Sequence, residues 1–224
     1  FNISILLAVY YETSFLLEIL TLQKEYISEL VIVDGPRRNS TALLAALGVL
    51  YSEDTSPVKT FVQTELADAF PDLSVRYLFR IWDDEKTQRD AGFDLCTGPV
   101  VMMADADMPM RLHHEAVAQF VHSDTGSRGR VAGVTVTTLV EWGVASSKAH
   151  PKKTGPAKHH VYRQNVMTNK LRIDADRFFD YLSIVGSRQR GRDQSDLFPP
   201  PVGAGDHYTV LRTINGTIAK YAFY

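Results

Sequence analysis

Two aspartates, Asp105 and Asp107, stand directly after a continuous apolar run, Val100 to Ala104. An apolar run of this kind is typical of a strand that is covered on both faces. Residues two apart in an extended chain point to the same side, so both carboxylates can face one cation. Mg²⁺ and Mn²⁺ prefer such oxygen ligands. The pair therefore predicts a divalent cation at the carboxyl end of a buried strand, where open α/β sheets bind their ligands.

The residues before this strand separate the pair from a second Asp-x-Asp, Asp174 to Asp176, which we interpret as the solvated start of a helix. The residues from Lys86 onward predict a helix that Asp84 can cap and that Thr97-Gly98-Pro99 ends. A helix, a tight turn and a buried strand are therefore expected to position the two carboxylates.

This stretch resembles the middle of a family 2 glycosyltransferase of the GT-A fold. Those enzymes carry an arginine-asparagine-x-glycine helix, a Thr-Gly turn, an apolar strand and an Asp-x-Asp. Here the helix motif is Arg89-Asp90-Ala91-Gly92, with Asp90 in place of the asparagine. The resemblance implies that Arg89 lies near a diphosphate, and that Asp107 holds Mn²⁺ or Mg²⁺, with Asp105 as a second ligand through water. The alternative for Arg89 is a surface ion pair with a neighbouring acid.

The N-terminal third predicts a strand-helix-strand unit. Ile3 to Tyr10 and Leu30 to Val33 are apolar enough for strands, and a helix through about Tyr26 can be capped by Thr13 or Ser14. Such a unit implies a right-handed parallel crossover. No glycine-rich phosphate loop follows either strand, which disfavours a dinucleotide fold and a P-loop.

The same resemblance covers the ends of these two strands. Ala8 to Glu12 partly matches the family's P-V-Y-N-E, and Val33 to Pro36 partly matches its D-D-G-S. It implies that Tyr10 stacks near the base, that Glu12 lies near the ribose and that Asp34 accepts a hydrogen bond from a base N–H. The alternatives are that Tyr10 is a core residue and that Asp34 only closes a turn.

Arg37 and Arg38 follow the second strand. We interpret them as solvated cations near the mouth of the site, with phosphate contact as the alternative.

The rest of the chain is expected to continue an α/β pattern. Trp142 to Ile173 has no acidic residue and is interpreted as a basic loop. The further predicted elements are helices at Ser40–Ser52, Val58–Phe70, His113–His122 and Asp174–Val185, and strands at Val75–Phe79 and Val131–Leu139.

Gly191 to Leu197 resembles a passage of galactosyltransferase-like GT-A enzymes that carries the catalytic acid. The resemblance implies that Asp193 is the general base that takes the proton of the acceptor hydroxyl, with Asp196 as the second candidate. Arg192 replaces the first acid of the family's pair, and a helix start charged by two acids is the alternative. The resemblance also makes His207 a candidate third metal ligand from a flexible C-terminal segment.

Composition fits one globular domain. The chain has 224 residues, 45% of them hydrophobic, a net charge of −2 and a single cysteine, Cys96, expected to be a buried inert thiol. We expect residues 1–110 to bind the nucleotide sugar and residues 111–224 to bind the acceptor. The sequence stops inside an expected strand, which leaves the end of the second half open. No nucleic acid partner and no transmembrane segment are expected, and the predicted location is cytoplasmic or peripheral to a membrane.

These features together predict an α/β protein of the GT-A (nucleotide-diphospho-sugar transferase) fold, with a mixed, mainly parallel sheet flanked by helices. The implied activity is metal-dependent, inverting transfer of a hexose from a nucleotide-diphosphate sugar, with a UDP-sugar preferred, to the hydroxyl of a glycan or other acceptor. One alternative is a catalytically degenerate domain that binds sugar nucleotides, which Arg192 favours. Another is a nucleotidyltransferase of similar fold.

Overall fold

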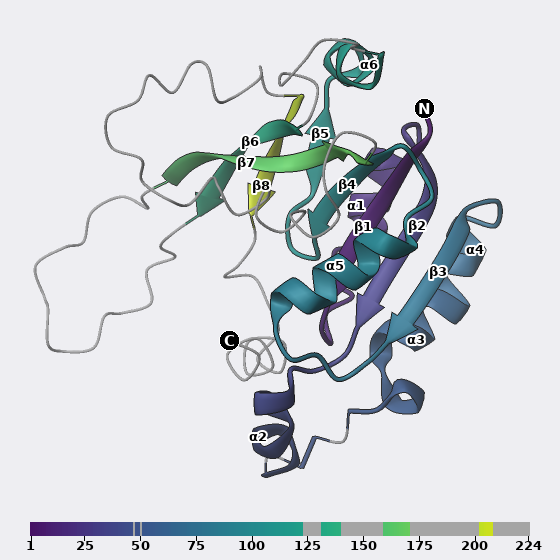
Figure 1. The fold of residues 1–224 in the computed structure, drawn as a ribbon, viewed down its shortest axis with the longest axis vertical. Coiled ribbons are helices and arrows are strands. Elements are labelled where there is room, and N and C mark those ends of the chain that lie inside the picture. Colours follow the sequence, from purple (N-terminus) through teal and green to yellow (C-terminus); the bar gives the residue numbers. More distant parts are fainter. Residues whose placement is uncertain (47, 50, 123–130, 140–158, 171–201, 208–224) are drawn as a thin grey trace, which may run out of the picture.

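The computed structural model describes residues 1–46, 48–49, 51–122, 131–139, 159–170 and 202–207. These residues form one eight-stranded sheet in the order β3-β2-β1-β4-β7-β6-β8-β5 (Figure 1). Strands β3, β2, β1 and β4 are parallel, and β7 adds antiparallel to β4. The predicted α/β class, with a mixed, mainly parallel sheet flanked by helices, is confirmed.

The elements have the following bounds. The strands are β1 (Ile3–Val9), β2 (Ile27–Asp34), β3 (Ser74–Phe79), β4 (Val100–Asp105), β5 (Met110–Leu112), β6 (Val131–Leu139), β7 (His159–Asn169) and β8 (Gly203–His207). The α-helices are α1 (Leu16–Gln23), α2 (Thr41–Ala46), α3 (Pro57–Phe61), α4 (Ala67–Ala69), α5 (Glu85–Leu95) and α6 (His114–His122). Short helical turns η1 (Arg38–Ser40) and η2 (Glu53–Thr55) and the π-helical segment η3 (Val62–Leu66) complete the described chain.

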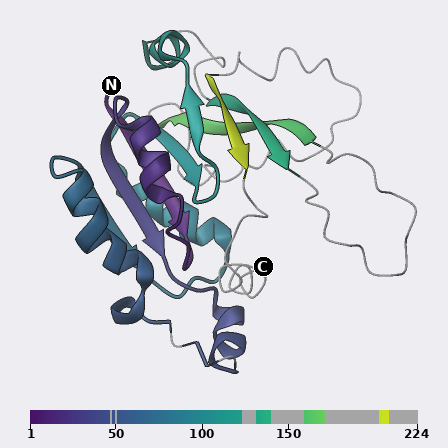
Figure 2. The same cartoon turned by 180° about the vertical axis from the view of Figure 1, so that it is seen from behind.

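The parallel half of the sheet is buried on both faces, and the period of two along each strand divides its side chains between two layers. Helix α5 covers one face, and α1 with the α3–α4 segment covers the other (Figures 1 and 2). In β1, Ile5 and Leu7 pack in the layer that contains α1, whereas Leu6 packs with Phe93 of α5. Because helices cover both faces of the sheet here, these strands are apolar along their whole length, as the sequence predicted.

Helix α5 lies close to the sheet because of Gly92. A Cβ atom at that position would stand 2.2 Å from Cδ1 of Leu6 and 3.1 Å from Cγ1 of Val33. The predicted cap is present, since the Asp84 side chain accepts from the Thr87 amide at 2.7 Å in a capping box. Asp84 thus sets the start of α5, and Gly92 allows its close packing on the sheet.

A buried carboxylate fixes the turn that follows α5. Glu29 of β2 accepts from the Ser4 hydroxyl at 2.5 Å, from the Thr97 amide at 2.7 Å and from Nε of Arg76 at 2.9 Å. Ser4 in turn accepts from the Gly98 amide at 2.8 Å. The Thr-Gly turn is thus tied to β1 and β2 before the chain enters β4.

Three local predictions are wrong. The stretch from Trp142 to Ile173 contains β7, which lies in the middle of the sheet, so its second half is not a loop. The predicted helix at Ser40–Ser52 is divided into η1 and α2, with neither reaching Gly48. Phe15, not Thr13 or Ser14, occupies the N-cap of α1 and makes no side-chain cap bond. In the first two cases tertiary contacts outweigh the local charge and helical periodicity, since β7 pairs with β4 and β6 and the Tyr51 hydroxyl is bonded to Asp34.

Other predictions hold or are not tested. Cys96 is buried and its thiol donates to the Gly92 carbonyl at 3.3 Å. Burial raises the pKa of this thiol to about 12, as expected for an inert thiol.

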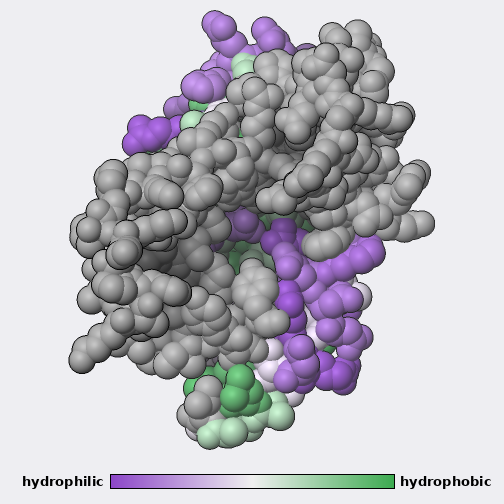
Figure 3. Space-filling view, turned by 90° about the vertical axis from the view of Figure 1, so that its left-hand side faces the viewer, coloured by the Kyte–Doolittle hydropathy of each residue, from purple (hydrophilic) through white to green (hydrophobic). Residues whose placement is uncertain are grey.

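No helix among the described residues is long and apolar enough to cross a bilayer. The described surface seen in Figure 3 is mainly hydrophilic, with a small apolar group at its lower end. The predicted helix at Asp174–Val185 and the second Asp-x-Asp lie outside the described residues.

Candidate functional site

The candidate site lies at the carboxyl edge of the parallel strands. Asp105 is registered against Ala8 of β1, and Asp34 is registered against the next residue, Val9. The chain builds β1, β2 and β3 toward one side and then returns to place β4 on the other side of β1. Ligands of open α/β sheets bind at such a switch point. Asp34 and Asp105, which are far apart in the sequence and which we predicted as site residues, therefore lie along the same edge.

The loop after β1 leaves the sheet through a tight turn. Tyr11 has a φ of +62°, and the Glu12 amide donates to the Tyr10 carbonyl at 2.8 Å. A positive φ is rare for a residue with a ring and a Cβ, and a turn closed over three residues with it is strained. The Glu12 carboxylate is buried and accepts from the Ser14 amide at 3.0 Å. Glu12 thus fixes the turn, and its predicted place beside a ribose stays a prediction.

Asp34 lies at the end of β2 and is fully buried. Its Oδ1 accepts from the Tyr51 hydroxyl at 2.6 Å and the Gly35 amide at 2.7 Å. Its Oδ2 accepts from the Ser56 hydroxyl at 2.5 Å and the Tyr77 hydroxyl at 2.7 Å. Burial raises the pKa of the Asp34 carboxyl, and these donors oppose that rise. A base N–H can reach Asp34 only by replacing one of these donors.

Tyr51 is the residue that sequence reasoning missed. Its ring lies 4.9 Å from that of Tyr10, 5.7 Å from that of Tyr11 and 5.8 Å from that of Phe79, measured between centroids. Its hydroxyl also accepts from the Tyr11 amide at 3.2 Å. Burial and the Asp34 carboxylate raise the pKa of Tyr51, so it stays a neutral donor. Tyr51 lies after α2, in a stretch that we predicted to be the end of a helix, and only the tertiary structure brings it to Asp34.

Tyr10 belongs to this aromatic group. It is buried with Leu44 of α2, which agrees with the alternative reading of Tyr10 as a core residue. Burial raises the pKa of its hydroxyl, and the Asp34 carboxylate and Tyr11 add to the effect. Whether its ring also stacks on a base stays a prediction.

Helix α5 contributes Gln88 and Arg89 to the edge. The Gln88 amide donates to the Val33 carbonyl at 3.0 Å and, more weakly, to the Val9 carbonyl at 3.4 Å. Gln88 therefore connects α5 to the C-terminal residues of β1 and β2. Asp90, which replaces the family's asparagine, pairs with Lys86 at 2.5 Å.

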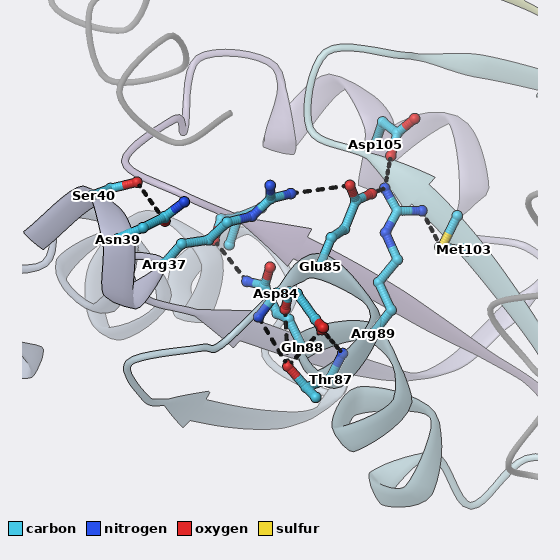
Figure 4. Close-up of polar contacts among 11 residues, drawn as sticks. Arg37, Asn39, Ser40, Asp84, Glu85, Thr87, Gln88, Arg89, Met103 and Asp105 are labelled. Atoms are coloured by element: carbon cyan, nitrogen blue, oxygen red, sulfur yellow. Dashed lines mark hydrogen bonds and ion pairs between the residues drawn. The ribbon is translucent and has the colours of Figure 1, made fainter.

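Arg89 is held by two carboxylates and a thioether. Its Nη2 atom lies 2.5 Å from Oε1 of Glu85 and 3.1 Å from Oδ1 of Asp105, and its Nη1 atom lies 2.7 Å from Sδ of Met103 (Figure 4). The ion pair with a neighbouring acid that we gave as the alternative for Arg89 is therefore present, but Arg89 is only 13% exposed, so the pair is not on the surface. Because Arg89 contacts Asp105, it also lies beside the predicted metal ligands.

The two acids after β4 differ in environment. The Asp105 side chain is 26% exposed and faces Arg89, whereas Asp107 is only 2% exposed. The Met108 amide donates to the Asp105 carbonyl at 3.1 Å, so Asp107 lies inside a turn that begins at the end of β4. The extended alternation that we expected to align the two carboxylates is therefore not present, because the strand ends at Asp105. Within the described residues there is no group of three or more His, Cys, Asp or Glu side chains that could hold a metal. Two carboxylates nevertheless fit Mg²⁺ or Mn²⁺, which commonly bind through one or two carboxylates together with substrate phosphates.

The remaining predicted site residues belong to the C-terminal half. Asp193 and Asp196, with Arg192, lie outside the described residues. His207 is the last residue of β8 and is registered against Thr138 of β6. Its backbone thus belongs to a strand of the sheet, which differs from the flexible segment that we expected.

The comparisons with known proteins identify no family. No protein-family model matches the chain, and no curated protein matches it.

Several solved structures are similar at a distance. TarS 1–349 from S. aureus, in complex with UDP-GlcNAc, has a TM-score of 0.40 and 15% identity over 66% of this chain and 38% of its own. A mannosyltransferase, PcManGT from Pyrobaculum calidifontis, in complex with GDP-Man and Mn²⁺, has a TM-score of 0.39 and 16% identity over 60% of this chain and 34% of its own. HddC from Yersinia pseudotuberculosis has a TM-score of 0.39 and 4% identity over 60% and 58%. This chain thus spans less than two thirds of each, and likeness at this distance decides neither family nor activity.

Proposed function

We propose that this protein is a glycosyltransferase that moves a sugar from a nucleotide-diphosphate sugar to an acceptor hydroxyl. The observation that supports it best is that Asp34 and the Arg89–Asp105 ion pair lie at the same carboxyl edge of the sheet, on either side of the end of β1. A nucleotide sugar needs a base pocket, a cation for its diphosphate and a metal site. In this proposal Asp34 serves the base, Arg89 the diphosphate and Asp105 the metal, all at one edge of the sheet.

In this proposal Asp107 and Asp105 hold Mn²⁺ or Mg²⁺. The cation, when bound, neutralises charge on the departing nucleoside diphosphate. Arg89 orients the diphosphate through its planar guanidinium, which can grip two phosphate oxygens. Two carboxylates after a buried strand are a suitable oxygen donor set for either cation.

The chemical step that we propose is a single displacement with inversion. Asp193 accepts the proton of the acceptor hydroxyl, the freed oxygen attacks the anomeric carbon, and the bond from that carbon to the diphosphate oxygen breaks. Asp196 is the second candidate for the base. Both assignments rest on the resemblance of Gly191–Leu197, and the hexose and the glycan acceptor are proposed on the same ground.

The first prediction tests donor and metal together. Uridine diphosphate and guanosine diphosphate should raise the thermal unfolding temperature only when Mn²⁺ or Mg²⁺ is present. Ligand at 100 times its dissociation constant adds about 2.7 kcal/mol to the free energy of unfolding. Uridine diphosphate should act more strongly than adenosine or cytidine diphosphate if Asp34 accepts from a ring N–H, because uracil has this donor and the other two bases do not. Asp107→Asn, which keeps the size of the buried side chain, should remove the metal-dependent part of the shift.

Asp68→Asn is the matched control, because Asp68 is an exposed acid on α4. It should leave the metal-dependent shift unchanged. Equal stabilisation by nucleotide in excess chelator would contradict the metal assignment. No stabilisation by any nucleoside diphosphate or nucleotide sugar would contradict the proposed donor.

A second candidate function is supported by one residue. Arg192 stands where the galactosyltransferase-like passage has an acid, which favours a degenerate domain that binds sugar nucleotides without turnover. Detection of transferred sugar by mass spectrometry over a panel of hydroxyl acceptors separates the two. Binding of the donor without product on any acceptor would favour the degenerate domain.

A further inference from the structure

The Glu85 carboxylate lies between two guanidinium groups. Nη2 of Arg37 is 3.1 Å from its Oε2, and Nη2 of Arg89 is 2.5 Å from its Oε1 (Figure 4). Each carboxylate oxygen therefore takes a different arginine. The three side chains are largely withdrawn from solvent, with 14%, 25% and 13% exposure for Arg37, Glu85 and Arg89.

The two arginines are presented by separate and well-fixed elements. The Arg38 amide donates to the Trp82 carbonyl at 2.7 Å, and the Trp82 amide donates to the Pro36 carbonyl at 2.9 Å. This pairing continues the β2–β3 ladder past Asp34 and fixes the backbone of Arg37. Arg89 is fixed by α5 and by Asp105. The space between the guanidiniums is thus set by the fold and does not depend on Glu85 alone.

Arg37 differs from its neighbour Arg38, although the sequence led us to interpret both as solvated cations. The Arg38 side chain is 70% exposed and pairs with Asp83, which is 69% exposed. Arg37 turns the other way, toward Glu85 and the edge where Asp105 lies (Figure 4). An exposed pair of this kind contributes little to stability, whereas a withdrawn guanidinium needs an anion beside it.

We propose that Arg37 and Arg89 form an anion site for a phosphate or diphosphate group, and that Glu85 occupies this site until the anion displaces it. Carboxylate and phosphate oxygens suit the same guanidinium fork, so the exchange keeps both arginines paired. The resemblance to glycosyltransferases implies a phosphate contact for Arg89 only. The role of Arg37 and the exchange with Glu85 come from the geometry.

Glu85 is suited to such an exchange. It is the first residue of α5, so its side chain can turn outward without disturbing the helix. Its carboxylate is already a quarter exposed, and water can solvate it once it has left. While it stays, it competes with any incoming anion for both arginines. Removing its charge should therefore strengthen anion binding, the opposite of what is expected for a residue that helps to hold the ligand.

The test uses inorganic pyrophosphate as the probe, by titration calorimetry in chelator-containing buffer of low ionic strength. Arg37→Gln should weaken binding about tenfold or more, as expected for a lost hydrogen bond between charged groups. Glu85→Gln keeps the shape of the side chain and should strengthen binding about three- to tenfold. Arg38→Gln, the matched control one residue away, should change it less than about twofold.

Thermal unfolding of each variant without ligand shows whether it is folded. If Arg37→Gln does not fold, Arg37→Lys takes its place, because lysine keeps the charge but loses the planar fork, and it should also weaken binding. Weaker binding in Glu85→Gln, equal losses in Arg37→Gln and Arg38→Gln, or no binding by either the unmodified protein or Glu85→Gln would each overturn the proposal.

That the natural anion is the diphosphate of a sugar donor rests on the proposed function, whereas the anion site does not. The two fail separately in the measurements. Pyrophosphate binding without metal tests the arginine pair and Glu85. Stabilisation by nucleoside diphosphates with Mn²⁺ tests the proposed function, and its failure would leave the pyrophosphate result intact.

Discussion

At the scale of single residues, buried carboxylates organise both ends of the parallel strands. Asp34 collects hydroxyl donors from Tyr51, Ser56 and Tyr77 at the carboxyl edge. A donor base that binds to Asp34 must take over one of these bonds. Base recognition in this chain would then require one of these hydroxyls to leave Asp34 while the others stay bonded to it.

Glu29 organises the opposite edge, and its ionisation gives a prediction for pH. Burial by itself raises the pKa of Glu29, but the Ser4 hydroxyl, Thr97 and Arg76 lower it, and the net pKa lies below the ordinary value. A carboxyl with a lowered pKa in the folded state stabilises the fold above its unfolded pKa, about 4.3. This contribution is lost as the pH falls from there through the lower folded value.

Glu29→Gln should therefore lower the free energy of unfolding by about 2 kcal/mol near pH 7. The difference from the unmodified protein should shrink as the pH falls below about 4. Urea denaturation at a series of pH values measures it. A difference that grows toward acid pH would show that Glu29 is protonated in the folded state, contrary to the prediction.

At the scale of elements, the β2–β3 pair depends on one glycine. Gly35 has a φ of +122°, and a Cβ there would stand 1.9 Å from the backbone carbonyl oxygen of Arg80. Both the backbone angle and the close approach exclude a side chain, and the Arg80 amide donates to the Asp34 carbonyl beside it. The glycine thus allows the ladder that places Arg37 to continue past Asp34.

Gly35→Ala should lower the free energy of unfolding by about 3 kcal/mol, from the strained angle and the clash together. Gly48 offers a matched control. It has a φ of +71° but nothing within 4 Å of an added Cβ, so Gly48→Ala should cost only the strain, about 1 to 2 kcal/mol. Chemical denaturation measures both. Equal losses would mean that the contact with Arg80 relaxes at no cost.

At the scale of the whole molecule, β7 joins the parallel half of the sheet to the half of mixed strand direction, in which β6 and β8 are parallel and β5 and β8 antiparallel. It pairs with β4 on one side and β6 on the other. Lys170, directly after β7, places its ammonium against the end of α5. Its Nζ donates to the carbonyls of Phe93 at 2.8 Å and Cys96 at 2.6 Å. The helix that carries Glu85 and Arg89 is thus capped by a residue from the other half of the sheet.

Lys170→Met should lower the free energy of unfolding by about 1 to 2 kcal/mol, because the cation at the helix C-terminus and its bonds to carbonyls are lost. Lys24→Met, at an exposed lysine after α1, should change it by less than about 0.5 kcal/mol. Urea denaturation compares the two variants. Similar effects at both positions would show that Lys170 does not stabilise the junction between the halves.

Local pattern in the sequence determined most of the parallel half. Apolar runs predicted β1 to β4 to within a few residues, and Asp84 with Thr97-Gly98 predicted the limits of α5. These features are encoded within short windows, since burial on both faces needs an unbroken apolar strand and a cap needs one side chain. Local pattern also predicted Asp105 as a metal ligand, whereas the donor contacts of Asp34 and Arg89 were implied by the resemblance. The strand register brings Asp34 and Asp105 to one edge, and the ion pair with Asp105 places Arg89 there.

Only the tertiary structure decided the rest. Strand β7 lies in an acid-free stretch that we interpreted as a basic loop. What makes it a strand is its pairing with β4 and β6, and this long-range pairing leaves no pattern in the local sequence. The roles of Tyr51 and Glu85 likewise come from contacts between residues far apart in the sequence. Tyr51 is bonded to Asp34, and Glu85 is paired with Arg37. Arg37 and Arg38 are identical in type and adjacent, yet one is withdrawn and the other exposed. Their difference is the direction of the backbone along the β2–β3 ladder, which sets neighbouring side chains on opposite sides and which sequence composition does not contain.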